Sequence, residues 1–168
     1  GLATRERMER TERKASETAQ LLGELRKAKY TPGVTLNDWL EKHHQPEAQN
    51  GLSAVELLKR PEITLSALAE LSPEIRQFGK PAQEQAEISV KYEGYLERQE
   101  TLIRHARQME ETLLPEDLPY EEVTGLRIEA RQKLMKQRPR SLAAASRIPG
   151  VSPADVAVLM VFLEKHKA

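Results

Sequence analysis

The strongest pattern in this chain is a heptad repeat of apolar and aromatic side chains that follows Pro81. Its steps alternate between four and three residues, as in a helix that buries a single stripe. A helix of about 30 residues extends roughly 45 Å. We expect this helix to bury its stripe by pairing with the first helix of the chain as an antiparallel hairpin. The stripe comprises Ile88, Tyr92, Tyr95, Gln99, Leu102, Ala106, Met109 and Leu113.

Helical patterns of other lengths fill the remainder of the chain, and no alternating strand pattern occurs. The first helix should run from Leu2 to about Lys29 and stop at the Thr-Pro-Gly sequence of residues 31–33. Trp39 is expected to fill the core. We therefore predict an all-α fold, a long helical hairpin or bundle followed by a small C-terminal helical bundle. The shorter helices are expected at 35–40, 54–59, 65–71, 127–137, 141–147 and 153–165. The last of them is apolar almost all round its first turns and should be the buried centre of the small bundle. The alanines at 143–145 should let the helix before it pack closely.

The two ends of the chain differ in charge although the net charge is zero. Residues 126–168 hold nine Lys and Arg against three acids, whereas residues 1–125 hold 17 against 23. A proline-flanked acidic segment at 115–119 suggests a boundary between a helical subdomain, 1–114, and a small basic bundle, 115–168. A basic end suits a surface that contacts phosphate. A chance distribution of solvated charge is the alternative.

Several classes of protein are excluded or disfavoured by the sequence. It has no cysteine, so disulfides and thiolate metal sites are excluded. The longest apolar run, 156–163, is too short to span a bilayer, and no secretory signal is present. Neither a dinucleotide nor a phosphate-loop motif occurs, and no third ligand accompanies His43 and His44. We expect a cytoplasmic protein. Because the chain begins with Gly-Leu and not with Met, we also expect it to be a piece of a longer protein. It should hold no metal or cofactor and should not be catalytic alone.

The segment from Ser146 to Asp155 predicts a tight turn between two helices. Gly150 supplies backbone freedom, and Ser152 is placed to cap the helix that follows. Backbone amides at that helix start, with Arg147 beside them, could hold a phosphate. An ordinary capped helix start is the competing interpretation, since Asp155 would repel a phosphate there.

A second candidate surface lies within the long helix. Lys91, Tyr95 and Arg98 share one face at helical spacing, and tyrosines with basic neighbours can stack on bases or contact phosphate. The tyrosines could equally be core aromatics whose hydroxyls reach the edge of the core. Gly94 costs about 1 kcal/mol relative to Ala inside a helix. Either a close approach of another backbone or of a ligand explains it, or the glycine is simply tolerated.

Several ordered motifs resemble one family, the large FAD-binding subunit of the tRNA uridine 5-carboxymethylaminomethyl modification enzyme, also called glucose-inhibited division protein A. The resemblance covers essentially the whole chain and is most specific from Lys91 onward. Where many relatives read Gly-Gln, this chain has Ala143-Ala144. The motifs are Gly1-Leu2, RPEITL (60–65), KYEGYLERQ (91–99), PEDLPY (115–120), GLRIEARQKL (125–134), RP (138–139) and ASRIPGVSPADVAVL (145–159).

The resemblance implies a division of labour within a longer protein. The family's N-terminal portion carries the FAD site and binds NADH, so both cofactors would lie outside this chain. The helical C-terminal portion would dock a partner GTPase and contribute to tRNA binding, with the parent a homodimer inside a heterotetramer. Together the two proteins modify the wobble uridine of certain tRNAs, with a folate one-carbon donor and glycine or ammonium.

The resemblance carries six residues over as candidates for contact with tRNA or the GTPase. Two rival functions stay open, a free-standing coiled-coil adaptor and a helix-hairpin-helix module that binds DNA through the turn after Arg147. The six candidates are Arg147, Gly150, Lys133, Lys91, Tyr95 and Arg98.

Overall fold

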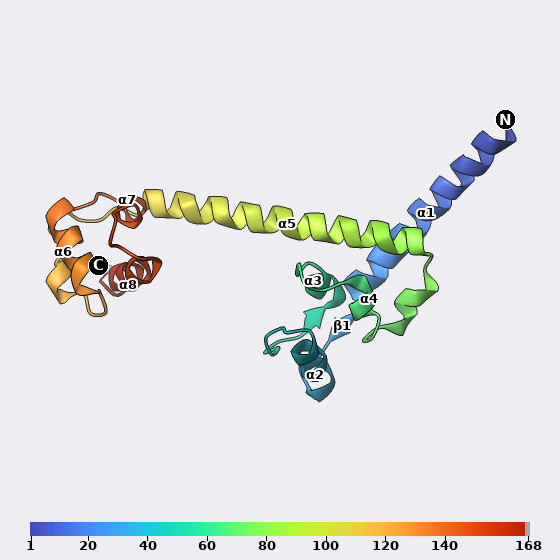
Figure 1. Cartoon of the computed structure of the whole chain (residues 1–168), viewed down its shortest axis with the longest axis horizontal. Coiled ribbons are helices and arrows are strands. Elements are labelled where there is room, and N and C mark those ends of the chain that lie inside the picture. The colour runs from blue at the N-terminus through green and yellow to red at the C-terminus, as the bar shows by residue number, and fades with distance from the viewer. Residues whose placement is uncertain (167–168) are drawn as a thin grey trace. The chain divides into compact units, whose positions relative to one another are not determined.

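The computed structural model describes residues 1–166, and the expected all-α class is confirmed (Figure 1). Lys167, one of the nine basic residues counted above, lies outside the described residues. None of the described helices is long and apolar enough to cross a membrane. The elements are α1 (Leu2–Lys27), β1 (Lys29–Tyr30), α2 (Val34–Lys42), β2 (Leu52–Ser53), α3 (Ala54–Leu58), α4 (Leu65–Leu68), η1 (Pro73–Gln77), α5 (Lys80–Glu111), η2 (Tyr120–Glu122), α6 (Ile128–Gln137), α7 (Leu142–Ser146) and α8 (Pro153–Lys165).

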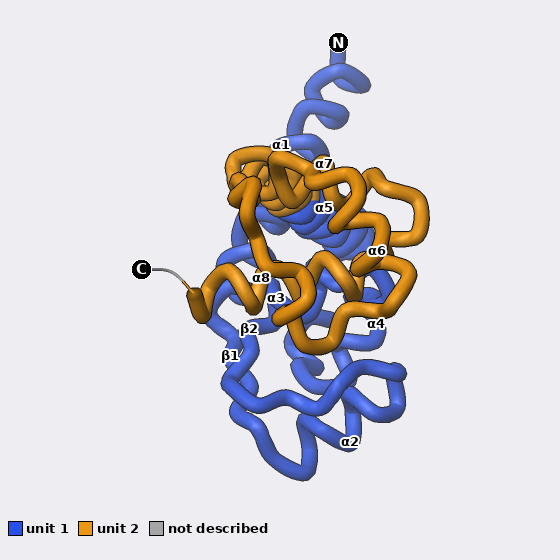
Figure 2. The backbone as a smooth tube through the Cα atoms, turned by 90° about the vertical axis from the view of Figure 1, so that its left-hand side faces the viewer, with its two compact units in different colours: residues 1–98 blue, residues 99–168 orange. Residues whose placement is uncertain are grey.

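The chain divides into two compact units, residues 1–98 and 99–168, which Figure 2 colours separately. We call them unit 1 and unit 2. The division falls inside α5, earlier than the expected boundary at 114/115. The reason is that the second half of α5 belongs with unit 2. Met109 of α5 packs against the core of that unit, of which Leu114 is the first buried residue.

Unit 1 has its own core, built by α1 to α4 and the first part of α5. Leu21 and Leu25 of α1 are buried against it. Trp39 is buried as expected, and its indole N–H donates to the carbonyl of Ala67 at 3.1 Å. A two-residue antiparallel ribbon, with Lys29 opposite Ser53, joins the helices. Strands this short carry no periodic signal, so the sequence did not predict them.

The buried face of α5 is not the predicted heptad stripe. Ala82, Ala86, Val90 and Gly94, spaced by four, face the core of unit 1. The stripe lies on the opposite side, where Tyr92 is 61% exposed. Small side chains on the buried face let α5 approach α3 closely, because a Cβ on Gly94 would stand 3.0 Å from the Lys59 carbonyl oxygen. Close backbone approach therefore explains the glycine.

The two long helices belong to a bundle and do not form a hairpin. The main packing partner of α1 is α3, and Figure 1 shows α1 and α5 crossing at an angle. They meet where the Glu17 carboxylate accepts a hydrogen bond of 3.0 Å from the Gly79 N–H. A hairpin would need the heptad stripe against α1, and that stripe is exposed.

Unit 2 is a small bundle of η2, α6, α7 and α8. Leu113 bridges to Ser141, which ties the end of α5 to the start of α7. Ala143 and Ala145 are buried, so α7 packs closely on α8 as their small size suggested. The last helix was expected at the centre of this bundle. It buries only one side, through Asp155, Val156 and Leu159.

The contact of α5 with α3 predicts opposite effects for two glycine substitutions. Gly94→Ala should destabilise the chain by about 1 kcal/mol, because the close approach to Lys59 outweighs the better helix propensity of Ala. Gly23→Ala is the matched control, since a Cβ there meets nothing within 4 Å and should stabilise α1 by up to about 1 kcal/mol. Urea unfolding followed by circular dichroism measures both. Equal stabilisation by the two changes would contradict this packing.

Candidate nucleic-acid interface

The turn between α7 and α8 is held by the buried carboxylate of Asp155. Ser152 caps α8, and the Asp155 side chain accepts hydrogen bonds from the Ser152 backbone and hydroxyl, a complete capping box. The Arg127 guanidinium donates two further bonds to Oδ2, at 3.0 and 3.1 Å, and one to the Gly150 carbonyl. The predicted cap is confirmed. Arg127, the residue directly before α6, also binds the capping carboxylate.

These hydrogen bonds decide the charge of Asp155. Burial alone would raise the pKa of this carboxyl, but the bonds from Ser152 and Arg127 outweigh burial and lower the pKa to about 2. The helix start therefore already holds a carboxylate anion of its own chain. This arrangement favours the structural interpretation of the turn over a phosphate cradle formed by the amides at the α8 start.

Gly150 is required by the backbone of this turn. Its φ is +98°, a left-handed conformation that favours glycine. The Glu129 side chain of α6 packs against it, since a Cβ on Gly150 would lie 2.9 Å from Glu129 Oε1. Gly150 thus positions the turn against α6. Its carbonyl is engaged by Arg127.

Arg147 follows α7 directly and stands at the surface. Its side chain is 69% exposed, and one terminal nitrogen pairs with the Glu110 carboxylate at the end of α5. A guanidinium has five N–H donors, so this pair leaves donors for another ligand. Arg147 therefore stays accessible at the surface beside Glu110.

Lys91 and Arg98 are engaged inside unit 1. The Lys91 amine donates to the carbonyls of Leu58, Arg60 and Ile63, and burial lowers its pKa. Arg98 donates to the carbonyl of Lys59 at 3.1 Å. These two cations satisfy carbonyls at and after the end of α3, a role that cations commonly take at helix C-termini. Their spacing on α5 matches that role as well as it matches an RNA contact.

Tyr95 lies one turn from each of those cations on α5, with its ring at the surface. It is 50% exposed, and its ring stacks on that of Tyr92 with centroids 6.5 Å apart. Neither ring belongs to the core of unit 1, so the core-aromatic alternative is wrong for both.

The cations of residues 127–140 in unit 2 fall into two groups. Arg131 donates to the Val123 carbonyl, and Arg138 donates to the Leu118 carbonyl and lies over the Tyr120 ring. Like Arg127, both serve the fold. The second group is exposed and forms no side-chain hydrogen bond or ion pair within residues 1–166; it comprises Lys133, Lys136 and Arg140. Only Lys133 was singled out from the sequence.

Lys133 and Lys136 lie three residues apart on the outer face of α6, so their amines are neighbours. Glu129, one turn earlier, is the acid nearest to Lys133 on α6, but its carboxylate lies against Gly150. No ion pair joins it to Lys133 in the described chain. We call Lys133, Lys136 and Arg140 the α6 cations.

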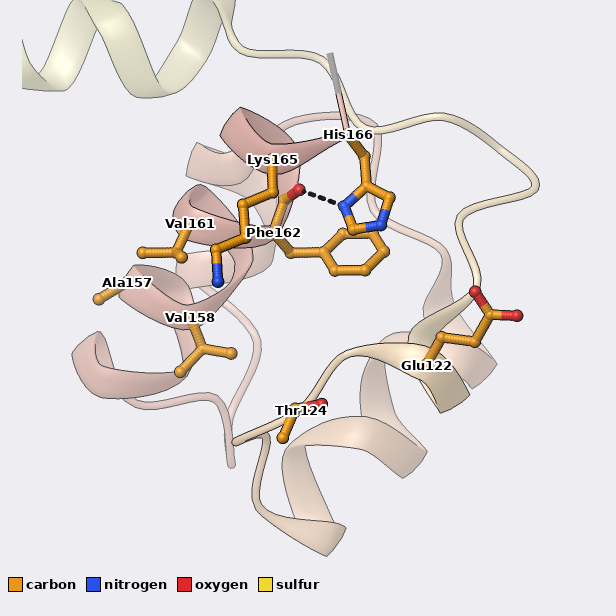
Figure 3. A pocket seen from close by; sticks show the side chains of 8 residues that line it. All are labelled: Glu122, Thr124, Ala157, Val158, Val161, Phe162, Lys165 and His166. Atoms are coloured by element: carbon orange, nitrogen blue, oxygen red, sulfur yellow. Dashed lines mark hydrogen bonds between the residues drawn. The ribbon is translucent and has the colours of Figure 1, made fainter. Parts of the chain in front are cut away.

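The exposed side of α8 borders a shallow groove of about 460 Å³ (Figure 3). Val158, Val161 and Phe162 supply its apolar wall, and Val161 is 54% exposed. The His166 ring stacks on Phe162 with centroids 4.0 Å apart. Lys165 stands beside them at the end of α8. This groove was missed from the sequence, because α8 was expected to be buried all round.

Fold and surface together define an all-helical chain that exposes a set of unengaged cations on α6 and, at Arg140, just after it. Two family models cover it. Residues 5–100 match the tRNA modifying enzyme MnmG/GidA C-terminal helical domain, and residues 102–168 match its C-terminal helical bundle. The chain belongs to the MnmG/GidA family and corresponds to its C-terminal helical region.

Individual relatives agree with this assignment. The tRNA uridine 5-carboxymethylaminomethyl modification enzyme MnmG of Alkaliphilus metalliredigens is 40% identical over 168 residues, which cover 99% of this chain and 26% of that protein. The same enzyme of Syntrophobacter fumaroxidans is 43% identical over 145 residues, 86% of this chain and 23% of that protein. The chain thus spans about a quarter of the length of these relatives.

A solved structure, Aquifex aeolicus GidA in its form II crystal, aligns with 94% of this chain and 24% of its own. The sequence identity is 26% and the TM-score is 0.40.

The Asp155 network predicts an acid-sensitive contribution to stability. Asp155→Asn should lower the free energy of unfolding by about 2 kcal/mol at neutral pH, because the ionised acceptor is lost. The folded pKa lies below the ordinary 3.8, so this contribution is present above that pH and disappears as pH falls from 3.8 towards 2. The variant and the parent chain should therefore converge in acid.

Urea unfolding at neutral and acid pH measures the difference. Asp117→Asn is the control, since it removes an exposed carboxylate from the same unit. A pH-independent gap between the Asp155 variant and the parent chain would contradict the assigned role.

Proposed function

We propose that this chain is the tRNA-binding, non-catalytic part of a flavin-dependent enzyme that modifies the wobble uridine of tRNA. The observation that carries the proposal is the set of α6 cations, which are exposed and have no partner in the described chain. In this proposal FAD and NADH bind elsewhere in the longer protein. The names of the relatives, which act on a tRNA uridine, support tRNA as the ligand.

Phosphate is the group that the α6 cations would contact. Lysine amines act as compact point charges, and cations that neutralise phosphates release the counterions bound there. Such contacts position an RNA without reading its bases. Arg147 is included in the proposed surface because most of its side chain is exposed. Lys91 and Arg98 are left out of it, because each donates to backbone carbonyls within unit 1.

Reversal of charge on α6 tests the proposal. Lys133→Glu combined with Lys136→Glu should weaken binding of a tRNA transcript about tenfold or more at low salt. The same change should reduce the slope of log affinity against log salt concentration by about 1 to 2. Both positions are exposed, so the helical circular dichroism signal should stay unchanged. Fluorescence anisotropy over a salt series gives both numbers.

The control reverses charges on an acid-paired lysine of unit 1. Lys42→Glu removes an exposed cation that already pairs with Glu70 at 3.3 Å, and should leave tRNA affinity nearly unchanged. Competition with duplex DNA at equal phosphate concentration separates the proposal from the helix-hairpin-helix alternative. Displacement of tRNA by DNA at equal concentration, or no effect of the α6 changes, would overturn it.

We propose docking of the partner GTPase as a second function of unit 2. The apolar groove along α8 supports it, because an exposed apolar wall with a neighbouring cation is typical of a protein contact. The resemblance of the motifs supplies the identity of the partner. The α6 cations and this groove would then divide RNA binding and protein binding between two helices of unit 2.

A single charge in the groove tests docking. Val161→Glu should reduce capture of the purified GTPase at least tenfold and leave tRNA affinity within about twofold, because a buried unpaired carboxylate is costly. Val34→Glu is the matched control, because it makes the same substitution at an exposed valine of unit 1, which is 78% exposed. Undiminished capture by the Val161 variant would place docking elsewhere.

A further inference from the structure

A second group of unengaged cations surrounds a groove at the crossing of α1 and α5 in unit 1. The groove has a volume of about 360 Å³. Its wall on α1 carries Arg10, Arg13 and Lys14, which share one face of the helix at spacings of three and four residues. All three side chains are exposed. We call them the α1 cations.

The α1 cations form no ion pair within the described chain. Within residues 1–166 none of them takes part in a side-chain hydrogen bond or an ion pair. The one acid that lines the groove is Glu17, and its carboxylate accepts the Gly79 N–H. Glu9 lies one turn before Arg13 on α1, and its carboxylate pairs with Arg5 at 3.9 Å.

The opposite wall contributes more positive potential. Gly79, Pro81 and Ala82 line it at the beginning of α5, and the exposed Lys80 follows Gly79 directly. The N-terminal end of a helix carries a partial positive charge that favours anions. Here the Glu17 carboxylate already accepts the Gly79 N–H at that end, so the positive potential of the groove comes from the α1 cations and Lys80.

We propose that this groove binds the phosphodiester backbone of RNA, as a second contact separate from the α6 cations. The composition of the groove favours nucleic acid over an acidic protein. Protein contacts depend on bulky apolar or aromatic anchors in pockets, and this groove offers only Pro81 and the small residues beside it. Backbone contacts to RNA need only cations and room for a strand. The identity of the RNA as tRNA rests on the proposed function.

Two double variants with the same change of charge test this site. Arg10→Glu with Arg13→Glu should weaken binding of a labelled tRNA transcript to the full chain about tenfold at low salt. It should also reduce the salt slope by about 1 to 2. Arg5→Glu with Arg26→Glu changes exposed residues on other faces of α1 and should alter affinity less than twofold. Circular dichroism checks that helicity is retained.

The outcomes separate this site from the proposed function. If the α6 variant loses affinity and the α1 variant does not, the groove is overturned and the proposed function stands. If neither variant loses affinity, both are overturned. If the Arg5 and Arg26 control loses as much affinity for the transcript as the α1 variant, the loss is due to the overall charge of the chain, and the groove is overturned. Displacement of the transcript by polyglutamate as effectively as by polyuridylate would overturn RNA in favour of an acidic protein.

Discussion

The ion pair between the buried Asp155 carboxylate and the exposed Arg127 is the interaction on which the arrangement of unit 2 depends. A carboxylate inside a protein is costly unless charged and polar donors surround it, and here Ser152 and Arg127 supply them. The pair fixes the start of α8 to the residue before α6. Because the turn and α6 are held in register, Gly150 can receive the Glu129 side chain. The acid closest to Lys133 along the helix is thereby turned away from it.

Hydrogen bonding within the chain also explains why several of its cations are not candidates for binding. Arg98 and Arg138 donate to backbone carbonyls, as does the Lys91 amine. Guanidinium and ammonium groups used in this way close helix ends and loops that water would otherwise have to satisfy. Among the cations that stay exposed, two sets are grouped by helical spacing, one at α6 and one on α1. Which cations can bind phosphate therefore depends on the hydrogen bonds that each one makes within the chain. The net charge of the chain, which is zero, does not show this.

Much of the fold follows from local sequence rules, and the deviations have physical causes. The caps at Ser53 and Ser152, the prolines and the glycines place most helix ends within a few residues. Periodicity also located α5, but it selected the wrong face. A heptad of large side chains normally marks the core, whereas α5 approaches α3 through small residues spaced by four, such as Ala86 and Gly94. Which face is buried depends on a neighbour distant in sequence. The same holds for Lys91, whose carbonyl partners lie about 30 residues away, and for Lys136, whose freedom from acids only the fold reveals.

Lysine footprinting tests the central claim most directly, that free cations on α6 contact tRNA while engaged ones do not. Each lysine of the chain would be methylated reductively with and without a tRNA transcript, and its rate read by mass spectrometry. We predict that Lys133 and Lys136 are protected by the transcript. Lys91 should react slowly in both cases, because its amine is half-buried and bonded to three carbonyls. Protection of Lys91 with unchanged rates at Lys133 and Lys136 would contradict the account.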